Sequence, residues 1–139
     1  MLRLTCLSLA ILLAIGAVLN GTYMLIAPVS WYLGVPGVTD TGPFNQHFIR
    51  DIGIVYLFLG AAYGIGAWRP GPRVVLWAAA TLWQCSHALF HFWEVAVGIC
   101  GPSALVRDFA AVTLPALVGI GLTWWAGHDA RAARHPAAT

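Results

Sequence analysis

Charge is scarce in this sequence, and one basic residue type is missing altogether. The 139 residues include seven arginines, no lysine and five acidic residues. Charged residues make up 9% of the chain, whereas soluble domains carry roughly 25%. This composition excludes a soluble enzyme and a disordered chain. A net charge of +2 also leaves no basic stripe to follow phosphates, which excludes a nucleic-acid binder.

Cysteine is also rare, and its odd count argues against a disulfide scaffold. The three cysteines are Cys6, Cys85 and Cys100, so at least one has no partner within the chain. Apolar residues are abundant instead, at 60% of the chain with a mean hydropathy of +0.78. We therefore expect most of the chain to lie in a lipid bilayer.

Apolar runs bounded by charge, glycine or proline predict the architecture. A spanning helix needs about 20 mostly apolar residues, and the chain contains four such runs. The predicted spans cover residues 4–27, 47–68, 74–98 and 107–127. We therefore predict an all-α, integral membrane four-helix bundle that forms a single domain over residues 1–139.

The predicted connections are short, apart from the first. Residues 28–46 combine Trp31 and Tyr32 with several glycines and prolines, which predicts an irregular segment at the membrane interface. Tight turns are expected at 69–73 and 99–103, and a tail is expected from His128 onward.

The arginines outside the predicted spans indicate the orientation. All of them fall on one side of a four-span chain: Arg3, Arg69, Arg73, Arg131 and Arg134. The positive-inside rule places that side, with both termini, in the cytoplasm. A cleaved signal peptide is the alternative for the first span, although the apolar run reaches Ile26, beyond the roughly 7–15 residues usual for such a signal.

Two similar motifs precede the second and fourth spans. Gly42-Pro43 is followed by Arg50-Asp51, and Gly101-Pro102 is followed by Arg107-Asp108. The pattern predicts two like-oriented helical hairpins, which pair the first span with the second and the third with the fourth. The alternative is that proline and aspartate simply suit a helix N-terminus.

The third span carries ionisable groups that lipid penalises. His87, His91 and Glu94 fall on one helical stripe, beside Trp83 and Gln84. The other spans contribute polar groups to the same outer half: Asn20, Tyr23, His47, Arg50, Asp51, Arg107 and Asp108. We predict that these groups form one outward-facing site, in which Glu94 is neutralised by protonation, by an arginine or by a metal ion.

Histidines and carboxylates at helical spacing favour a transition metal. His47 with Asp51 and His87 with His91 are i, i+4 pairs, so each pair can face one ion from a single helix. We predict an accessory protein that binds a metal or a small redox-type ligand. The predicted ligands of Zn, Fe or Cu are His47, His87, His91 and Glu94, and the predicted pocket residues are Asn20, Tyr23, Arg50, Asp51, Trp83, Gln84, Arg107 and Asp108. Haem and a quinone-like molecule are the alternative ligands.

Two other functions remain open. Arg50 with Asp51 or Glu94, and Arg107 with Asp108, would form an ion-pair network that braces a structural or assembly subunit. A small transporter or proton relay is the third interpretation, although the inner halves of the spans hold few polar groups. Besides the bilayer, the expected partners are another membrane protein or a second copy of the chain.

Glycines are expected to let the helices approach closely, as small residues do in membranes. The glycines in question are Gly16, Gly21, Gly53, Gly60, Gly64, Gly66, Gly119 and Gly121.

A family resemblance lies in the first half of the chain. Gly21 and Pro28, followed by Arg50-Asp51-Ile52-Gly53 and the run 56–60 (Tyr-Leu-Phe-Leu-Gly), resemble the DoxX-like superfamily of small four-helix bacterial membrane proteins, in an uncharacterised branch. The resemblance implies a four-span bundle in the bacterial inner membrane, linked in some members to redox or quinone-associated systems. It implies no catalytic residue, and the His87–Glu94 stretch lies outside it.

Overall fold

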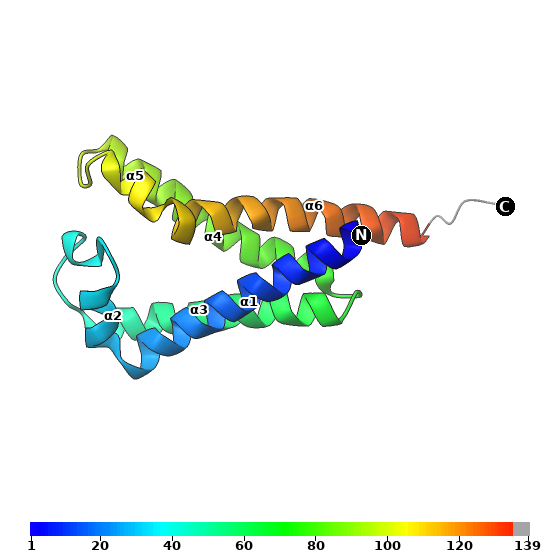
Figure 1. Cartoon of the computed structure of the whole chain (residues 1–139), viewed down its shortest axis with the longest axis horizontal. Helices are drawn as coiled ribbons and strands as arrows, with labels where there is room; N and C mark the ends of the chain where they lie inside the picture. Colours follow the sequence, from blue (N-terminus) through cyan, green and yellow to red (C-terminus); the bar gives the residue numbers. More distant parts are fainter. Residues whose placement is uncertain (135–139) are drawn as a thin grey trace.

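A computed structural model describes residues 1–134 of the chain, and these residues form an all-α structure (Figure 1). In chain order the helices are α1 (Leu2–Ile26), α2 (Pro28–Gly34), η1 (Val38–Asp40), α3 (Gln46–Trp68), α4 (Arg73–Ala96), α5 (Ser103–Asp108), η2 (Phe109–Thr113) and α6 (Leu114–Arg134). The segment η1 is a 3-10 turn, and η2 is a π-helical turn. The predicted all-α class is confirmed.

Three helices are long and apolar enough to cross a membrane. These are α1, α3 and the continuous stretch Ser103–Ala133, which α5, η2 and α6 form together. The remaining long helix, α4, has 24 residues, but Gln84, His87, His91 and Glu94 lower its hydropathy. The structure therefore contains three candidate membrane spans. Whether α4 is a fourth span depends on how its polar side chains are covered by the neighbouring helices.

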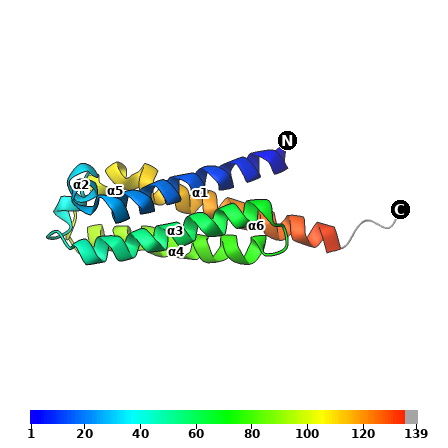
Figure 2. The same ribbon diagram turned by 90° about the horizontal axis from the view of Figure 1, so that it is seen from below.

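The long helices are arranged as two hairpins. The most extensive packing joins α1 to α3 and α4 to α6, and α3 also packs on α4. Figures 1 and 2 place the start of α1 and the end of α6 at the same end of the molecule. In consequence α1 and α4 run in one direction while α3 and α6 run in the other, which is the pairing predicted from the repeated motifs.

Two connecting segments differ from the prediction. The segment expected to be irregular contains α2, because Pro28 at its first position suits the start of a helix. The indole of Trp31 donates a hydrogen bond to Asn20 Oδ1 at 2.9 Å, which holds α2 against α1. The tail predicted from His128 is helical as far as Arg134, and the rest of the predicted tail lies outside the described residues.

A bend separates α5 from α6, and Pro115 explains it. Proline has no N–H group to bond the carbonyl of Ala111, and its ring clashes with that carbonyl. The π-helical turn Phe109–Thr113 lies immediately before it and absorbs the break, and Figure 1 shows the chain bending there. The bend brings Asp108 of α5 to α4, where it lies beside His91.

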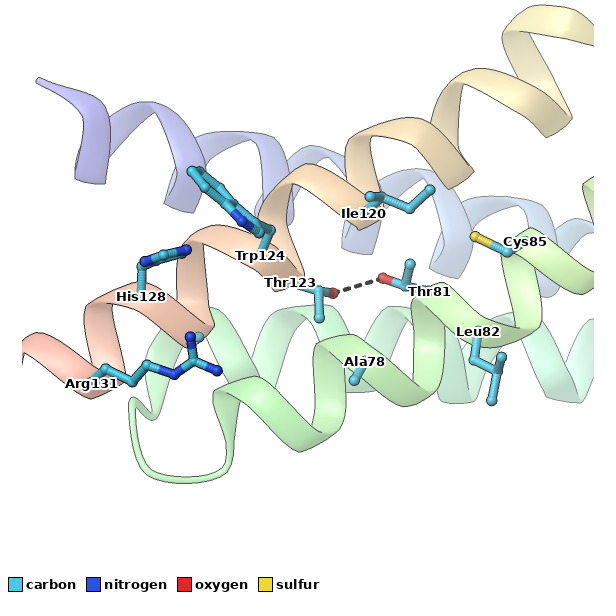
Figure 3. Close-up of a pocket in the computed structure, with 10 residues that line it drawn as sticks. Ala78, Thr81, Leu82, Cys85, Ile120, Thr123, Trp124, His128 and Arg131 are labelled. Carbon is cyan, nitrogen blue, oxygen red and sulfur yellow. Dashed lines mark hydrogen bonds between the residues drawn. The ribbon is translucent and has the colours of Figure 1, made fainter.

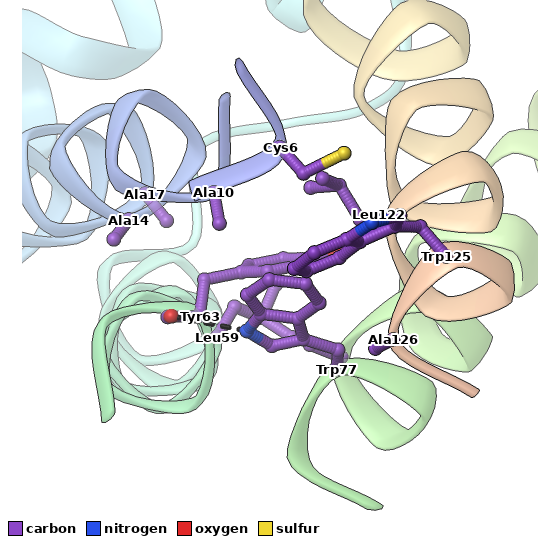
Figure 4. Packing of buried hydrophobic residues seen from close by; sticks show 11 residues of the cluster. Cys6, Ala10, Ala14, Ala17, Leu59, Tyr63, Trp77, Leu122, Trp125 and Ala126 are labelled. Atoms are coloured by element: carbon purple, nitrogen blue, oxygen red, sulfur yellow. Dashed lines mark hydrogen bonds between the residues drawn. The ribbon is translucent and has the colours of Figure 1, made fainter. Parts of the chain in front are cut away.

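The apolar core lies in the half of the molecule where α1 begins and α6 ends. Small residues of α1 pack there against two fully buried aromatic residues, Tyr63 and Trp77 (Figure 4). The indole N–H of Trp77 donates to the Tyr63 carbonyl oxygen at 3.1 Å. The full cluster is Cys6, Ala10, Ala14, Ala17, Leu59, Tyr63, Trp77, Ala80, Leu122, Trp125 and Ala126. Cys6, Cys85 and Cys100 are free thiols in the structure.

Glycines form the closest helix contacts, with two exceptions. A Cβ atom on Gly21 would lie 2.6 Å from the Gly53 carbonyl oxygen, so α1 and α3 cross backbone to backbone at this point. A Cβ atom on Gly60, Gly66 or Gly119 would also clash with a neighbouring helix, whereas a Cβ atom on Gly64 would make an ordinary van der Waals contact. The prediction is wrong for Gly16 and Gly121, where nothing lies within 4 Å.

Candidate functional site

The side chains predicted to form one polar site lie in separate groups. His47 and Asp51 contact each other at the start of α3, with His47 Nε2 3.1 Å from Asp51 Oδ2, and both are exposed. Arg50 donates from Nε to the Leu25 carbonyl oxygen at 3.2 Å. Arg50 therefore caps the last turn of α1 and makes no ion pair with Glu94. The single cluster predicted from depth alone is not formed, because depth does not determine which face each helix turns inward.

Asn20 and Tyr23 serve the α1–α2 corner and not the predicted pocket. Asn20 accepts the Trp31 hydrogen bond, and its amide lies 3.6 Å from the Met24 sulfur. Tyr23 is half-exposed, with its hydroxyl facing Gly34 of α2. Both residues therefore contact α2.

A continuous row of side chains does form on α4. The ring of His87 stacks on Trp83 with a centroid distance of 5.1 Å, and His91 meets the His87 ring edge-on at 4.8 Å. His91 Nδ1 lies 3.4 Å from Asp108 Oδ2, and Tyr56 of α3 packs edge-on against Trp83 at 5.5 Å. We call Trp83, His87, His91 and Asp108 the histidine ladder.

Arg107 closes the end of the ladder at Asp108. Its Nε donates to Asp108 Oδ1 at 2.8 Å and its Nη2 donates to Asp108 Oδ2 at 3.2 Å, which is a bidentate pair. Its Nη1 donates to Asp40 Oδ2 at 3.1 Å. Gly37, with φ of 84°, leaves the space that the guanidinium fills. Asp40 was not predicted as a site residue, because nothing in the sequence of this connecting segment indicates that it approaches Arg107.

The four predicted metal ligands are not assembled. Within residues 1–134 no group of three or more His, Cys, Asp or Glu side chains is placed to hold a metal ion. His47 pairs with Asp51, outside the ladder. Glu94 is 8% exposed and makes no ion pair with any residue in that range. The expected pairing of Glu94 with Arg50 or Arg107 is therefore not found.

A second polar group lies in the middle of the bundle, and only one of its members was predicted. The Tyr63 hydroxyl donates to Gln84 Oε1 at 2.7 Å and lies 3.1 Å from Thr81 Oγ1, which in turn lies 3.0 Å from Thr123 Oγ1. We call these four residues the hydroxyl cluster. A Cβ atom on Gly119 would meet the Tyr63 hydroxyl at 2.6 Å. Gln84 therefore links α3, α4 and α6 and does not face the histidines.

Removal of the Tyr63 hydroxyl is expected to destabilise the bundle. Tyr63→Phe leaves Gln84 Oε1 without its donor, and a buried polar group without a partner costs about 1–3 kcal/mol. Thermal unfolding of the purified protein in detergent measures the loss. Tyr32→Phe is the matched control, because that hydroxyl is exposed and bonds only the Gly42 carbonyl. An equal effect of the two variants would contradict the role given to the cluster.

Comparison with known proteins identifies no relative. No family model, curated protein or solved structure matches this chain. A functional proposal therefore depends on the geometry of the histidine ladder and on the membrane character of the helices.

Proposed function

We propose that the chain is a four-span integral membrane protein that binds a small redox-type ligand at the histidine ladder. Three candidate spans support the membrane location, and α4 packs against both α3 and α6, so its polar face is covered in part by its neighbours. Arginines at the end of the molecule where α1 begins and α6 ends support cytoplasmic termini. The ladder then belongs to the outer half of the bundle, in a bacterial inner membrane.

The observation that carries the proposal is the stacking of aromatic rings on a half-buried imidazole pair with a carboxylate at its end. Trp83 and His87 are stacked on each other, and a planar ligand could extend this stack because flat rings favour such contacts. The imidazole of His91, held beside the Asp108 carboxylate, can form a hydrogen bond with an oxygen atom of a ligand. A planar molecule that carries carbonyl or hydroxyl oxygens, such as a quinone, suits both features. We therefore favour a quinone-like ligand over a metal ion, since the predicted metal ligands are dispersed.

Membership of the DoxX-like superfamily is part of this proposal, and the structure gives its motif a physical role. Gly21 and Gly53 are the two sides of the α1–α3 crossing. Arg50 caps the last turn of α1 through the Leu25 carbonyl. The motif residues thus support a four-helix fold of that kind, and they do not contribute to the ladder.

The second candidate function is a structural subunit braced by ion pairs. It is favoured by Arg107, which pairs with its neighbour Asp108 within α5 and joins α5 to the loop before α3 through Asp40. Under this interpretation the contact between His91 and Asp108 only adds α4 to the ion-pair network. The two candidates differ in what happens when His87 is replaced, since His87 makes no ion pair with any described residue.

Ligand binding to the purified protein tests the proposal. We expect a short-chain benzoquinone to bind in detergent micelles and to quench tryptophan fluorescence. His87→Ala and Trp83→Leu should each weaken binding by about tenfold, the loss of roughly 1.4 kcal/mol of ring contact. His47→Ala and Trp124→Leu are matched controls, because both residues are exposed and lie outside the ladder.

The same preparations distinguish the alternatives. If the brace is the whole function, no quinone binds, and Asp108→Asn lowers the melting temperature while His87→Ala does not. If the unmodified protein contains stoichiometric metal and the His87→Ala/His91→Ala variant loses it, the ligand is a transition metal and not a quinone. A Soret band would indicate haem.

A further inference from the structure

An open groove of about 530 Å³ runs between α4 and α6 (Figure 3). Its walls are apolar along most of the length, with Ala78 and Leu82 on α4 and Ile120 and Trp124 on α6. Thr81 and Thr123 are the polar residues between them, and their hydroxyls lie 3.0 Å apart, bonded to each other. The walls therefore suit a hydrocarbon chain better than a polar molecule.

Positive charge is confined to one end of the groove. His128 and Arg131 line it there, on the last turns of α6, and Figure 3 shows both side chains beside the groove. The nearest acidic residue along α6 is Asp129, and its carboxylate is engaged by Arg73, 3.5 Å away. An anionic group at this end would therefore meet an arginine whose charge is not neutralised by that neighbour.

The length of the groove corresponds to one leaflet of a bilayer. From Ile120 to Arg131 the helix rises by about 16 Å, and half of a hydrocarbon core of about 30 Å is about 15 Å. The cationic end coincides with the end of the molecule where the chain begins and α6 finishes. Arg131 is thus placed at a membrane surface, with the apolar part of the groove directed toward the middle of the membrane.

We propose that this groove binds one anionic phospholipid of the leaflet on the side where α1 begins and α6 ends. An acyl chain lies along Leu82, Ile120 and Trp124, and the phosphate bonds the Arg131 guanidinium with His128 beside it. A helix of a partner protein would need an apolar surface across both leaflets, and a free phosphate would not use the apolar walls. The site is distinct from the histidine ladder, which lies toward the other end of α4.

Native mass spectrometry of the whole protein in detergent tests this inference. Phosphatidylglycerol and phosphatidylcholine with the same acyl chains are the probes. We expect phosphatidylglycerol to bind more tightly, and Arg131→Gln to lower its affinity about fivefold with little change for phosphatidylcholine. Arg131→Lys should retain most of the preference. Arg3→Gln is the matched control, because Arg3 is an exposed arginine at the same end of the molecule but outside the groove.

A second pair of variants tests the apolar part of the groove. Ala78→Phe should fill it and lower the affinity for both lipids, whereas Ala79→Phe places the same ring at an exposed neighbouring position that does not line the groove. Equal affinity for the two lipids in the unmodified protein, or equal losses in Arg131→Gln and Arg3→Gln, would overturn the proposal. Equal losses in the two phenylalanine variants would also overturn it. If Ala78→Phe does not purify as a single species, the Arg131 variants decide alone.

Discussion

Replacement of Arg73 by leucine is expected to lower the free energy of unfolding by roughly 3–5 kcal/mol. Arg73 is the first residue of α4 and is only 3% exposed. Its Nε donates to the Gly66 carbonyl oxygen at 2.7 Å and its Nη2 donates to the Ala67 carbonyl oxygen at 3.3 Å. Its guanidinium also lies 5.4 Å and 5.5 Å from the ring centres of Trp77 and Trp125. Leucine replaces none of these interactions.

Thermal unfolding in detergent micelles, followed by tryptophan fluorescence, measures this loss. Arg69→Leu is the matched control, since Arg69 is exposed in the preceding turn and should change stability by about 0.5 kcal/mol or less. Arg73→Lys should be intermediate, because it retains the charge but not the fork of donors. Equal melting temperatures for the Arg73→Leu and Arg69→Leu variants would show that the hydrogen bonds from Arg73 to the α3 carbonyl oxygens do not stabilise the protein.

The role of Arg73 marks a limit of what composition alone predicts. As a flanking arginine it contributes to the predicted orientation, and nothing more was expected of it. One signal was available, because a cation at the first position of a helix opposes the helix dipole. The structure resolves this conflict, since the end of α3 lies beside the start of α4, and a cation is favourable at a helix C-terminus.

The helices themselves were predictable because hydropathy and helix length are local properties. The predicted spans 47–68 and 74–98 correspond to α3 (Gln46–Trp68) and α4 (Arg73–Ala96), within one or two residues at each end. The short α2 and the π-helical turn before Pro115 were not predicted, since proline marks both a break and a helix start. The pairing of the helices was predicted from the repeated motif. The arginines of its two copies nevertheless bind different partners, because Arg50 bonds the Leu25 carbonyl oxygen whereas Arg107 bonds Asp108 and Asp40.

Within the site, contacts along one helix were predictable and contacts between helices were not. His87 and His91 lie next to each other because an i, i+4 spacing places them on one face. The partner of His91 is Asp108 and not Glu94, because the bend at η2 carries Asp108 to α4. Asp40, Thr81 and Thr123 were missed for the same reason: their contacts depend on the rotation of each helix and the path of a loop.

Alanine substitution at two glycines of α1 is expected to change stability in opposite directions. In Gly21→Ala the new methyl group would lie 2.6 Å from the Gly53 carbonyl oxygen and 3.0 Å from Tyr56 Cβ. Neither atom can rotate away, so α1 and α3 must separate, at a net cost of roughly 2–3 kcal/mol by the precedent of overpacked cores. In Gly16→Ala nothing lies within 4 Å of the new methyl group, and the better helix propensity of alanine should stabilise the protein by up to about 1 kcal/mol.

Melting temperatures of the two variants in the same detergent test this difference, since both replace glycine by alanine in the same helix. Gly53→Ala provides a check from the other side of the crossing: its methyl group would lie 3.0 Å from the Gly21 carbonyl oxygen, so its loss should be smaller than that of Gly21→Ala and of the same sign. Because α1 and α3 share the most extensive helix contact in the molecule, separating them should also loosen the Arg50 cap on Leu25. If Gly21→Ala is tolerated as well as Gly16→Ala, then α1 does not cross α3 at Gly21, and the first hairpin must pack differently.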